Sequence, residues 1–472
     1  MKTIEILSAV GVLALLAEIF RFKKFLLPLI LIGLLGAIGA AVYDWNTNIH
    51  YYHNMLTFDN YALLFSIVLC GTVFLWLLSS QSFFSDEHLT DKSSLAIFSL
   101  IGAVLIVSYS NMVMLFIGVE ILSIPLYVLA GSKKNNLASN EAALKYFLMG
   151  AFASGFLLFG IALLYGCFGT FDLHTIQTYL TPPVPSQARP SDSQWILLSG
   201  GILFMLIGIS FKASAVPFHF WAPDVYEGSP TQVTAFMASI VKTAAFAAFL
   251  RLFLCFANLG NVWVNVVWVM AGATILLGNI TAVYQSSVKR MLAYSSISHA
   301  GYLTLAILSM NNFSAGAVLY YSASYSVATI GAFTVLAIIE NNFGAVTFDS
   351  FSGLAKKNPF LAFAMTIAML SLAGIPPLAG FFGKYYLFSS ALQSGYLWIV
   401  LIAVLGSLIG VYYYFRVIIT MYSTAPSSIS PEGGENLLPF GEVGWGTKIV
   451  LIITILLSLA LGLFPDLVIR LI

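Results

Sequence analysis

Six ionisable side chains lie at comparable depth inside apolar segments that are long enough to cross a lipid bilayer, and a further one, Arg416, lies near the inner end of such a segment. The six are Glu120, Lys145, Lys212, Lys242, His299 and Lys384. A charged group in the bilayer centre costs several kcal/mol unless it is paired or hydrated. Static ion pairs that hold helices together are one explanation for any single group. They do not account for the whole set, because we expect only Glu120 to be available as a buried acid for four lysines.

An excess of buried lysine over buried acid suits proton transfer. Burial disfavours the ammonium form, whereas a nearby carboxylate or water favours it, so such a lysine can change protonation when its partner moves. His299 can pass a proton through either ring nitrogen. His219 is a possible further member of the relay and is otherwise a polar lining residue. The other histidines fall in expected loops and should be solvated; they are His50, His53, His88 and His174.

Two of the apolar segments are interrupted by proline beside a lysine. Pro217 follows Lys212 by five residues, and Lys384 follows the pair Pro376-Pro377. Proline lacks a backbone donor and breaks a helix, and a broken helix within a membrane is tolerated where it lines a wet cavity. Both segments are therefore expected to be discontinuous helices that carry a functional lysine. The alternative is that the prolines are packing kinks only.

The composition is that of a polytopic membrane protein. Of 472 residues, 60% are hydrophobic and 8% are charged, against about 25% charged in soluble domains. A net charge of +1 with dispersed basic residues argues against nucleic-acid binding. Cys70, Cys167 and Cys255 are far apart in apolar segments, so we expect packing residues rather than a disulfide framework or a cysteine-ligated metal.

A window of about 20 apolar residues predicts an all-α chain with about fourteen transmembrane helices. The first, from Ile4 to Phe20, is interpreted as a retained span rather than a cleaved signal. The expected ranges are 3–20, 25–43, 60–79, 94–109, 111–131, 138–166, 195–221, 230–256, 263–284, 289–310, 314–339, 359–390, 396–422 and 447–469. The longest connections, 168–194 and 423–446, are too short for a soluble domain. No glycine-rich phosphate-binding motif stands in a strand–turn–helix context, so we expect no cofactor or metal on this chain.

Basic residues in short loops predict which side faces the cytoplasm. Eleven fall after odd-numbered spans and four on the opposite side, which places both termini outside. The eleven are Arg21, Lys23, Lys24, Lys92, Lys133, Lys134, Lys289, Arg290, Lys356, Lys357 and Lys448, and the four are Lys2, Arg189, Arg251 and Arg470.

The two broken segments are the seventh and the twelfth, five positions apart. Because five is odd, equivalent helices run in opposite directions, which is typical of an inverted repeat. The same offset pairs Glu120 with His299 and Lys242 with Arg416. The expected units are 1–93 (spans 1–3), 94–257 (spans 4–8, the first five-helix repeat), 258–422 (spans 9–13, the second, inverted repeat) and 423–472 (a loop and span 14).

Three runs of sequence carry a resemblance that extends over essentially the whole chain. They are Phe211 to Thr231, Lys289 to Tyr302 and Gly374 to Lys384. The chain resembles the antiporter-like membrane subunits of respiratory complex I, and most closely the N-type group of bacterial NADH-quinone oxidoreductases. The Pro-Asp-Val-Tyr-Glu-Gly-Ser-Pro run is specific to that group, whereas the run ending near His299 is shared with multisubunit sodium/proton antiporters. A lysine at position 384 and an end soon after the last span also fit the N type.

The resemblance implies a proton relay of Glu120, Lys212, Lys242, His299 and Lys384, with Lys145 matching a lysine of the bacterial N-type sixth span. It implies that Glu120 pairs with the Lys212 ammonium in one state. It places the chain in a bacterial inner membrane beside an M-type subunit and the small K-, J- and A-type subunits. FMN, iron–sulfur clusters, NADH and quinone would be used by other subunits, which supply the energy. Two alternatives are a cation/proton antiporter subunit and a non-transporting membrane scaffold.

Overall fold

The computed structural model describes residues 1–17, 19–20, 22–80, 88–181, 192–344, 346–423 and 443–469, and most of these residues are helical. The helices of the first half are α1 (Lys2–Leu16), α2 (Lys23–Tyr43), α3 (Asn60–Ser79), α4 (Leu89–Ser108), α5 (Met112–Ala130), α6 (Leu137–Phe168), α7 (Leu173–Leu180), α8 (Asp192–Ala213), α9 (Trp221–Gly228), α10 (Thr231–Phe236), the π-helix η2 (Met237–Val241) and α11 (Lys242–Cys255).

The second half has the same character. Its helices are the 3₁₀-helix η3 (Ala257–Leu259), α12 (Gly260–Val283), α13 (Val288–Ser309), α14 (Ser314–Phe343), the 3₁₀-helix η4 (Phe348–Phe351), α15 (Leu354–Lys357), α16 (Pro359–Ala373), α17 (Ala379–Gln393), α18 (Leu397–Tyr422), α19 (Trp445–Leu463) and α20 (Asp466–Ile469). A short antiparallel hairpin joins α2 to α3, with β1 (Ile49–Tyr51) paired to β2 (Leu56–Phe58) so that Ile49 lies opposite Phe58.

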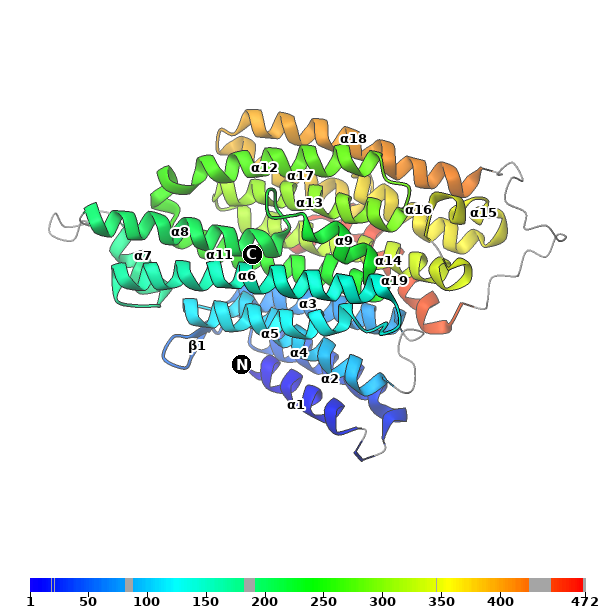
Figure 1. The fold of residues 1–472 in the computed structure, drawn as a ribbon, viewed down its shortest axis with the longest axis horizontal. Helices are drawn as coiled ribbons and strands as arrows, with labels where there is room; N and C mark the ends of the chain where they lie inside the picture. The colour runs from blue at the N-terminus through cyan, green and yellow to red at the C-terminus, as the bar shows by residue number, and fades with distance from the viewer. Residues whose placement is uncertain are drawn as a thin grey trace.

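The long helices lie side by side along the longest axis of the molecule, with α1 and α2 at one edge and α18 at the opposite edge (Figure 1). The buried centre is formed by α10, η2 and α11 together with α13 and α14. In the most apolar stretch of each segment, 100% of residues are buried for 231–255, 94% for 288–309 and 89% for 314–343. The corresponding share is 28% for α2 and α19, so these two helices present apolar side chains outward, as lipid-facing helices do.

The prediction of an all-α polytopic membrane protein is confirmed. Twelve helices within the described ranges are long and apolar enough to cross a bilayer. The helices α4 and α5 are separate, as expected. The number fourteen stays a prediction, because α1 and α16 each have only 15 residues. Arg21, Arg189 and Arg470, used above for orientation, lie outside the described residues, as do parts of the two longest connections.

Both predicted helix breaks are present, and the helices that precede them end with the same type of cap. The helix α8 stops at Ala213, and Ser214 takes the left-handed conformation with φ of 59°. The helix α16 stops at Ala373, and Gly374 does the same with φ of 85°. In each, the amide two residues beyond the last helical residue bonds back to a carbonyl five residues earlier, Ala215 to Ser210 and Ile375 to Leu370, which is the Schellman arrangement. The chain then restarts as α9 and α17.

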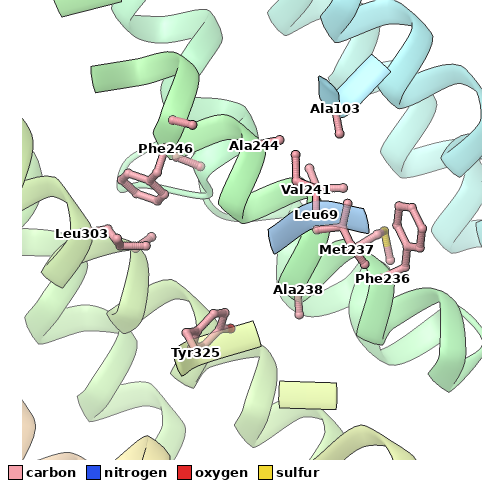
Figure 2. Close-up of a cluster of buried hydrophobic side chains, with 14 of the residues drawn as sticks. Leu69, Ala103, Phe236, Met237, Ala238, Val241, Ala244, Phe246, Leu303 and Tyr325 are labelled. Carbon is pink, nitrogen blue, oxygen red and sulfur yellow. The ribbon is translucent and has the colours of Figure 1, made fainter. Parts of the chain in front are cut away.

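The centre of the molecule is packed with apolar side chains from several helices around the α10–η2–α11 segment (Figure 2). Phe236 and Met237 lie near Leu69 of α3, and Tyr325 of α14 lies on the other side, near Ala238. All of these side chains are buried. Lys242, the first residue of α11, therefore lies within a stretch whose residues are all buried.

Candidate functional site

Lys212 lies in the last turn of α8, directly before the first break. Its side chain is 5% exposed, and its Nζ is 3.5 Å from the hydroxyl of Tyr127. The same nitrogen lies 5.4, 5.3 and 5.6 Å from the ring centres of Tyr127, Tyr146 and Phe211. Aromatic faces attract a cation, and the carbonyl end of a helix favours positive charge. The break thus creates a site in which an ammonium is held by rings and a helix end.

Glu120 lies one helix away, on α5, and is half-buried. Its Oε1 atom is buried and has no hydrogen-bond partner among the described residues. Within the described part of the chain, no ion pair of 4.0 Å or less joins Glu120 to Lys212. The direct Glu120–Lys212 pair implied by the resemblance is therefore absent from this conformation. Lys212 instead hydrogen bonds to the hydroxyl of Tyr127.

Lys242 opens α11 directly after the π-helix Met237–Val241, and its side chain is 1% exposed. Its Nζ is 2.6 Å from the Ser296 hydroxyl oxygen and also donates to the Ser296 carbonyl oxygen. A π-turn inserts an extra residue into a helix and re-aims the side chains that follow, and it recurs at functional sites. Here it precedes the lysine that joins the first half of the chain to α13.

His299 lies one turn after Ser296 on the same helix, so the two side chains share a face. Its Nδ1 is 2.5 Å from the Tyr321 hydroxyl, and its Nε2 is 2.9 Å from the Tyr414 hydroxyl. The Tyr414 hydroxyl in turn bonds to Ser295. Both ring nitrogens therefore contact groups that can donate or accept a proton.

Lys384 lies on α17 beyond the second break and is 6% exposed. Its Nζ donates to the Ala373 carbonyl and to the Ser407 hydroxyl, each at 2.8 Å. Ala373 is the last residue of α16, whose final carbonyls have no partner within the helix, so the break itself supplies this acceptor. A cavity of about 10 Å³ lies between His299 and Lys384 and is lined by Tyr321 and Ser324, which is room for about one water molecule.

Lys212 and Lys242 are not connected in this way. In the described part of the chain no hydrogen bond links them. The cavity beside Lys212 has a volume of about 10 Å³, and its lining includes Ala245 and Ala248 of α11 together with Ile106 and Leu115. Small apolar cavities stay dry. Polar groups therefore follow one another along α13 from Lys242 towards Lys384, whereas no polar group is seen to bridge Lys212 and Lys242 among the described residues.

Lys145 is paired with two carboxylates near the surface. Its Nζ is 2.7 Å from Glu141 and 2.8 Å from Asp224, and its side chain is 39% exposed. Asp224 also pairs with Arg290 at 2.9 Å. The expectation that Glu120 was the only acid available was wrong for this lysine, because α9 brings Asp224 beside it. Lys145 belongs to a surface ion-pair cluster that ties α6, α9 and α13 together.

We predict that replacing Asp224 with asparagine lowers the melting temperature of the detergent-solubilised protein by a few degrees at pH 7. Burial raises the pKa of this carboxyl, but the hydrogen bonds from Lys145 and Arg290 outweigh it, so the pKa lies below its ordinary value of 3.8. A lowered pKa means that the stabilisation is complete above that ordinary value and is lost as the pH falls through the lowered one. Melting curves of both proteins at pH 7 and near pH 3 measure the difference. Asp349→Asn, at an exposed position, is the control, and equal stability at pH 7 would rule out a contribution from the cluster.

Other ionisable residues take supporting places. His219, in the first break, is half-buried, and its Nδ1 has no hydrogen-bond partner among the described residues. Arg416 donates to the carbonyls of Val283 and Gln285 at 3.3 Å, outside the chain of contacts above. Lys289, counted above as a loop charge, begins α13 fully buried and donates to the Ser229 carbonyl at 2.6 Å. The three cysteines are free.

Several groups of the site were not singled out in the sequence. They are Tyr127, Ser296, Ser407, and the tyrosines Tyr321 and Tyr414 that flank His299. The Ser-Ser-Ile-Ser-His run in an otherwise apolar span was the available signal for Ser296. Tyrosines at apolar positions gave no such signal, because their rings suit packing as well as proton transfer.

Comparison with known proteins places the chain in a family. The family described as NADH:quinone oxidoreductase/Mrp antiporter, TM, matches residues 110–410. NADH-quinone oxidoreductase subunit N of Cytophaga hutchinsonii is 42% identical over 474 residues, covering 100% of this chain and 99% of that protein. Subunit N of Flavobacterium psychrophilum is also 42% identical, over 475 residues and 100% of both chains.

Solved structures agree with the sequence relatives. A chain of respiratory complex I from Thermus thermophilus is 32% identical, with a TM-score of 0.82 over 99% of this chain and 98% of that one. A chain of the Mrp complex from a Dietzia species shares the fold with a TM-score of 0.85, covering 99% of this chain and 95% of that chain at 20% identity. The chain therefore belongs to the family of antiporter-like membrane subunits shared by NADH:quinone oxidoreductase and Mrp antiporters.

Proposed function

We propose that this chain is a proton-translocating module in the membrane arm of an NADH:quinone oxidoreductase, in the position of the N-type subunit. The observation that carries the proposal is the row of buried polar groups in the core: Lys242 bonded to Ser296, His299 one turn further on the same helix, and Lys384 across a small cavity from His299. Such a series of titratable and hydroxyl groups in a lipid-embedded core is expensive to bury and is typical of proton relays.

The proposed route begins at Glu120 and Lys212. In one state the Glu120 carboxylate holds the Lys212 ammonium; when the two separate, the charge that favours the ammonium is lost and the proton moves on. Lys242 receives it, and Ser296, the His299 ring and the small cavity carry it to Lys384. Lys384 then opens towards the outer face.

Two observations support a gate between Lys212 and Lys242: no hydrogen bond joins them in the described part of the chain, and the cavity beside Lys212 is lined mostly by apolar side chains. A dry gap stops protons from leaking backwards, and it must become hydrated or rearranged for transfer. The surroundings of Lys212 fit the closed side of such a gate, because its ammonium is held by rings and Oε1 of Glu120 has no hydrogen-bond partner among the described residues. Moving one charge against the membrane field costs about 2.3 kcal/mol per 100 mV.

The two five-helix units remain part of the proposal. Within each unit, equivalent helices pack against equivalent partners. In the first unit α4 packs on α5 and α6 packs on α8, and in the second unit α12 packs on α13 and α14 packs on both α16 and α17. The shared caps at Ser214 and Gly374 support the same correspondence. We place the units at 94–257 and 258–422, with 1–93 and 423–472 as additions, and both termini on the outer face of a bacterial inner membrane.

The energy comes from partners in this proposal. The curated relatives named above are subunits of an oxidoreductase complex. We assign redox chemistry with FMN, iron–sulfur clusters, NADH and quinone to other subunits. We expect contacts with an M-type subunit and with the small K-, J- and A-type subunits. Within the described residues no group of three or more histidine, cysteine or acidic side chains is arranged to hold a metal ion.

Sealed vesicles distinguish this function from that of a cation/proton antiporter. Vesicles that contain the assembled complex should acidify on addition of NADH, at a rate that does not change when sodium replaces potassium. An antiporter subunit would instead move protons in response to a sodium gradient without NADH. A sodium-driven proton flux in the absence of NADH would overturn the proposal in favour of that alternative.

A further inference from the structure

Asn279 is a buried amide that lies outside the row of polar groups described above. It stands about one turn before the end of α12, and its side chain is 1% exposed. An amide in an apolar core is costly to bury unless its donors and its acceptor are hydrogen-bonded. The side chain of Asn279 makes three hydrogen bonds, one within α12, one to α13 and one to α18.

The backbone of α12 fixes which end of the amide faces each neighbouring helix. Nδ2 of Asn279 donates to the Ile275 carbonyl oxygen at 2.8 Å, and because a carbonyl can only accept, the amide nitrogen must lie on that side. The same nitrogen donates to the Tyr302 hydroxyl at 3.0 Å, and Oδ1 accepts from the Tyr413 hydroxyl at 3.0 Å. Asn279 therefore sets the direction of the hydrogen bonds to both tyrosines.

Two glycines of α18 face this amide. A Cβ atom at Gly406 would lie 3.0 Å from Nδ2 of Asn279 and would collide with the Ile275 side chain, and a Cβ atom at Gly410 would lie 3.3 Å from Oδ1. Small residues four positions apart let membrane helices approach closely. The amide is therefore held tightly between α12 and α18.

The ring of Tyr302 contacts both of the last two ionisable groups of the row. Its centre is 5.3 Å from Nζ of Lys384, which is within range of a cation–π interaction. The same ring meets the His299 ring edge to face, with 5.8 Å between the ring centres and 86° between the planes. A displacement of the Tyr302 ring would therefore change the surroundings of His299 and Lys384 together.

Tyr413 connects the amide to the other side of the histidine. The centre of its ring is 4.5 Å from that of Tyr414. The Tyr414 hydroxyl lies 2.9 Å from Nε2 of His299. Asn279 therefore anchors one tyrosine that contacts His299 and the immediate neighbour of another.

We propose that Asn279 is a positioning residue for proton transfer between His299 and Lys384. It carries no proton itself, because a neutral amide has no group that titrates. It keeps the Tyr302 ring beside Lys384 and His299, and it anchors Tyr413 on the opposite side. This inference rests on the proposed function, since a positioning residue has a role only if Lys384 takes part in proton movement.

The number of protons moved per electron, measured with a pH-sensitive dye in sealed vesicles of the assembled complex, tests the proposal. The loss in Lys384→Met defines the share of pumping that passes through this chain. Asn279→Leu removes all three hydrogen bonds at similar side-chain size, and Tyr302→Phe removes only the hydroxyl to which the amide donates. Each should lose more than half of that share while NADH oxidation continues. Because both changes break the same anchor, the double variant should lose no more than the larger single loss.

Tyr109→Phe is the matched control. Tyr109 is as buried as Tyr302, and its hydroxyl donates to the Ala248 carbonyl oxygen at 3.0 Å. This protein loses one buried hydroxyl bond of the same length without contact to His299 or Lys384, so it should keep the wild-type ratio. An equal loss in Tyr109→Phe and Tyr302→Phe would overturn the proposal, because any lost hydroxyl bond would then have the same effect.

The remaining outcomes separate this inference from the relay itself. If Lys384→Met pumps less but an assembled Asn279→Leu complex pumps at the wild-type ratio, or if the two single losses multiply in the double variant, the inference is wrong and the relay stands. If Asn279→Leu does not assemble, Tyr302→Phe decides: a loss of more than half of the share supports the inference, and a smaller loss overturns it. A wild-type ratio in Lys384→Met would instead refute the proposed function.

Discussion

Replacing Lys242 with methionine is expected to stop proton transfer between the two halves of this chain while the protein still folds. Methionine is unbranched like lysine and one atom shorter, and it packs readily in an apolar core, but it cannot carry a proton. Lys242 is the group that hydrogen bonds to α13 through Ser296. We expect the contribution of this chain to NADH-driven pumping to fall at least tenfold, measured with a pH-sensitive dye in sealed vesicles.

The Lys242→Met protein also leaves the Ser296 carbonyl oxygen without its lysine donor, which costs about 1–3 kcal/mol. A lower melting temperature is therefore part of the prediction, and assembly must be checked in each preparation. Lys356→Met, in a short helix outside the relay, is the matched control. If the Lys242→Met complex assembles and pumps like this control, Lys242 is not in the path.

Replacing Gly380 with alanine is expected to prevent correct folding of the second break. A Cβ atom at this position would lie 1.7 Å from the Ser371 carbonyl oxygen, so the backbone of α16 or α17 must move. Overpacking of a tight core costs about 1–3 kcal/mol, and more when backbone is displaced. Lys384 lies one turn beyond Gly380, so its bond to Ala373 would be lost with the docking of α17. We expect a several-fold drop in folded protein recovered from membranes, measured by size-exclusion chromatography.

Gly155→Ala is the control for this change. Gly155 also lies within a helix, but nothing lies within 4 Å of its added Cβ, so alanine there should be neutral or stabilise the protein by about 0.4–1 kcal/mol. Recovery of Gly380→Ala at the level of Gly155→Ala would mean that α16 and α17 can separate at no cost.

The helix breaks and their lysines could be predicted from sequence because their signals are local. Proline removes a donor wherever it stands, and glycine at position 374 permits the left-handed cap. Ser214 takes the same cap conformation without being glycine, so that cap was visible only through Pro217 three residues later. Charges in apolar spans were equally visible, because few other residues of these spans are polar.

The partners of those charges could not be predicted in the same way, because they depend on which helices meet. Asp224 stands in a polar loop of the sequence, yet α9 folds back to place it between Lys145 and Arg290. The π-turn before Lys242 contains no proline or glycine, so the sequence gives no local signal from which it could be predicted. Tyr321 and Tyr414 are separated by more than ninety residues and meet only at His299.

The two halves of the chain differ in how their buried polar groups are connected, and this difference suggests where proton transfer is controlled. Lys242 hydrogen bonds to Ser296 of the second half, His299 one turn further on hydrogen bonds to two tyrosines, and a cavity for one water lies between His299 and Lys384. In the described part of the chain no hydrogen bond joins Lys212 to Lys242, and the cavity beside Lys212 is mostly apolar. Proton transfer is most readily controlled at a point where the row of polar groups is interrupted. We therefore propose that Lys212 and its neighbours control proton transfer and that the second half conducts the proton.

The role of Lys212 in proton movement is measured by the number of protons moved per electron by the Lys212→Ala complex in sealed vesicles. Alanine removes the lysine ammonium at the first break and is itself a good helix former at the end of α8. We expect an assembled complex that oxidises NADH but moves fewer protons per electron, by the full share of this chain. An assembled Lys212→Ala complex that pumps at the wild-type ratio would contradict it.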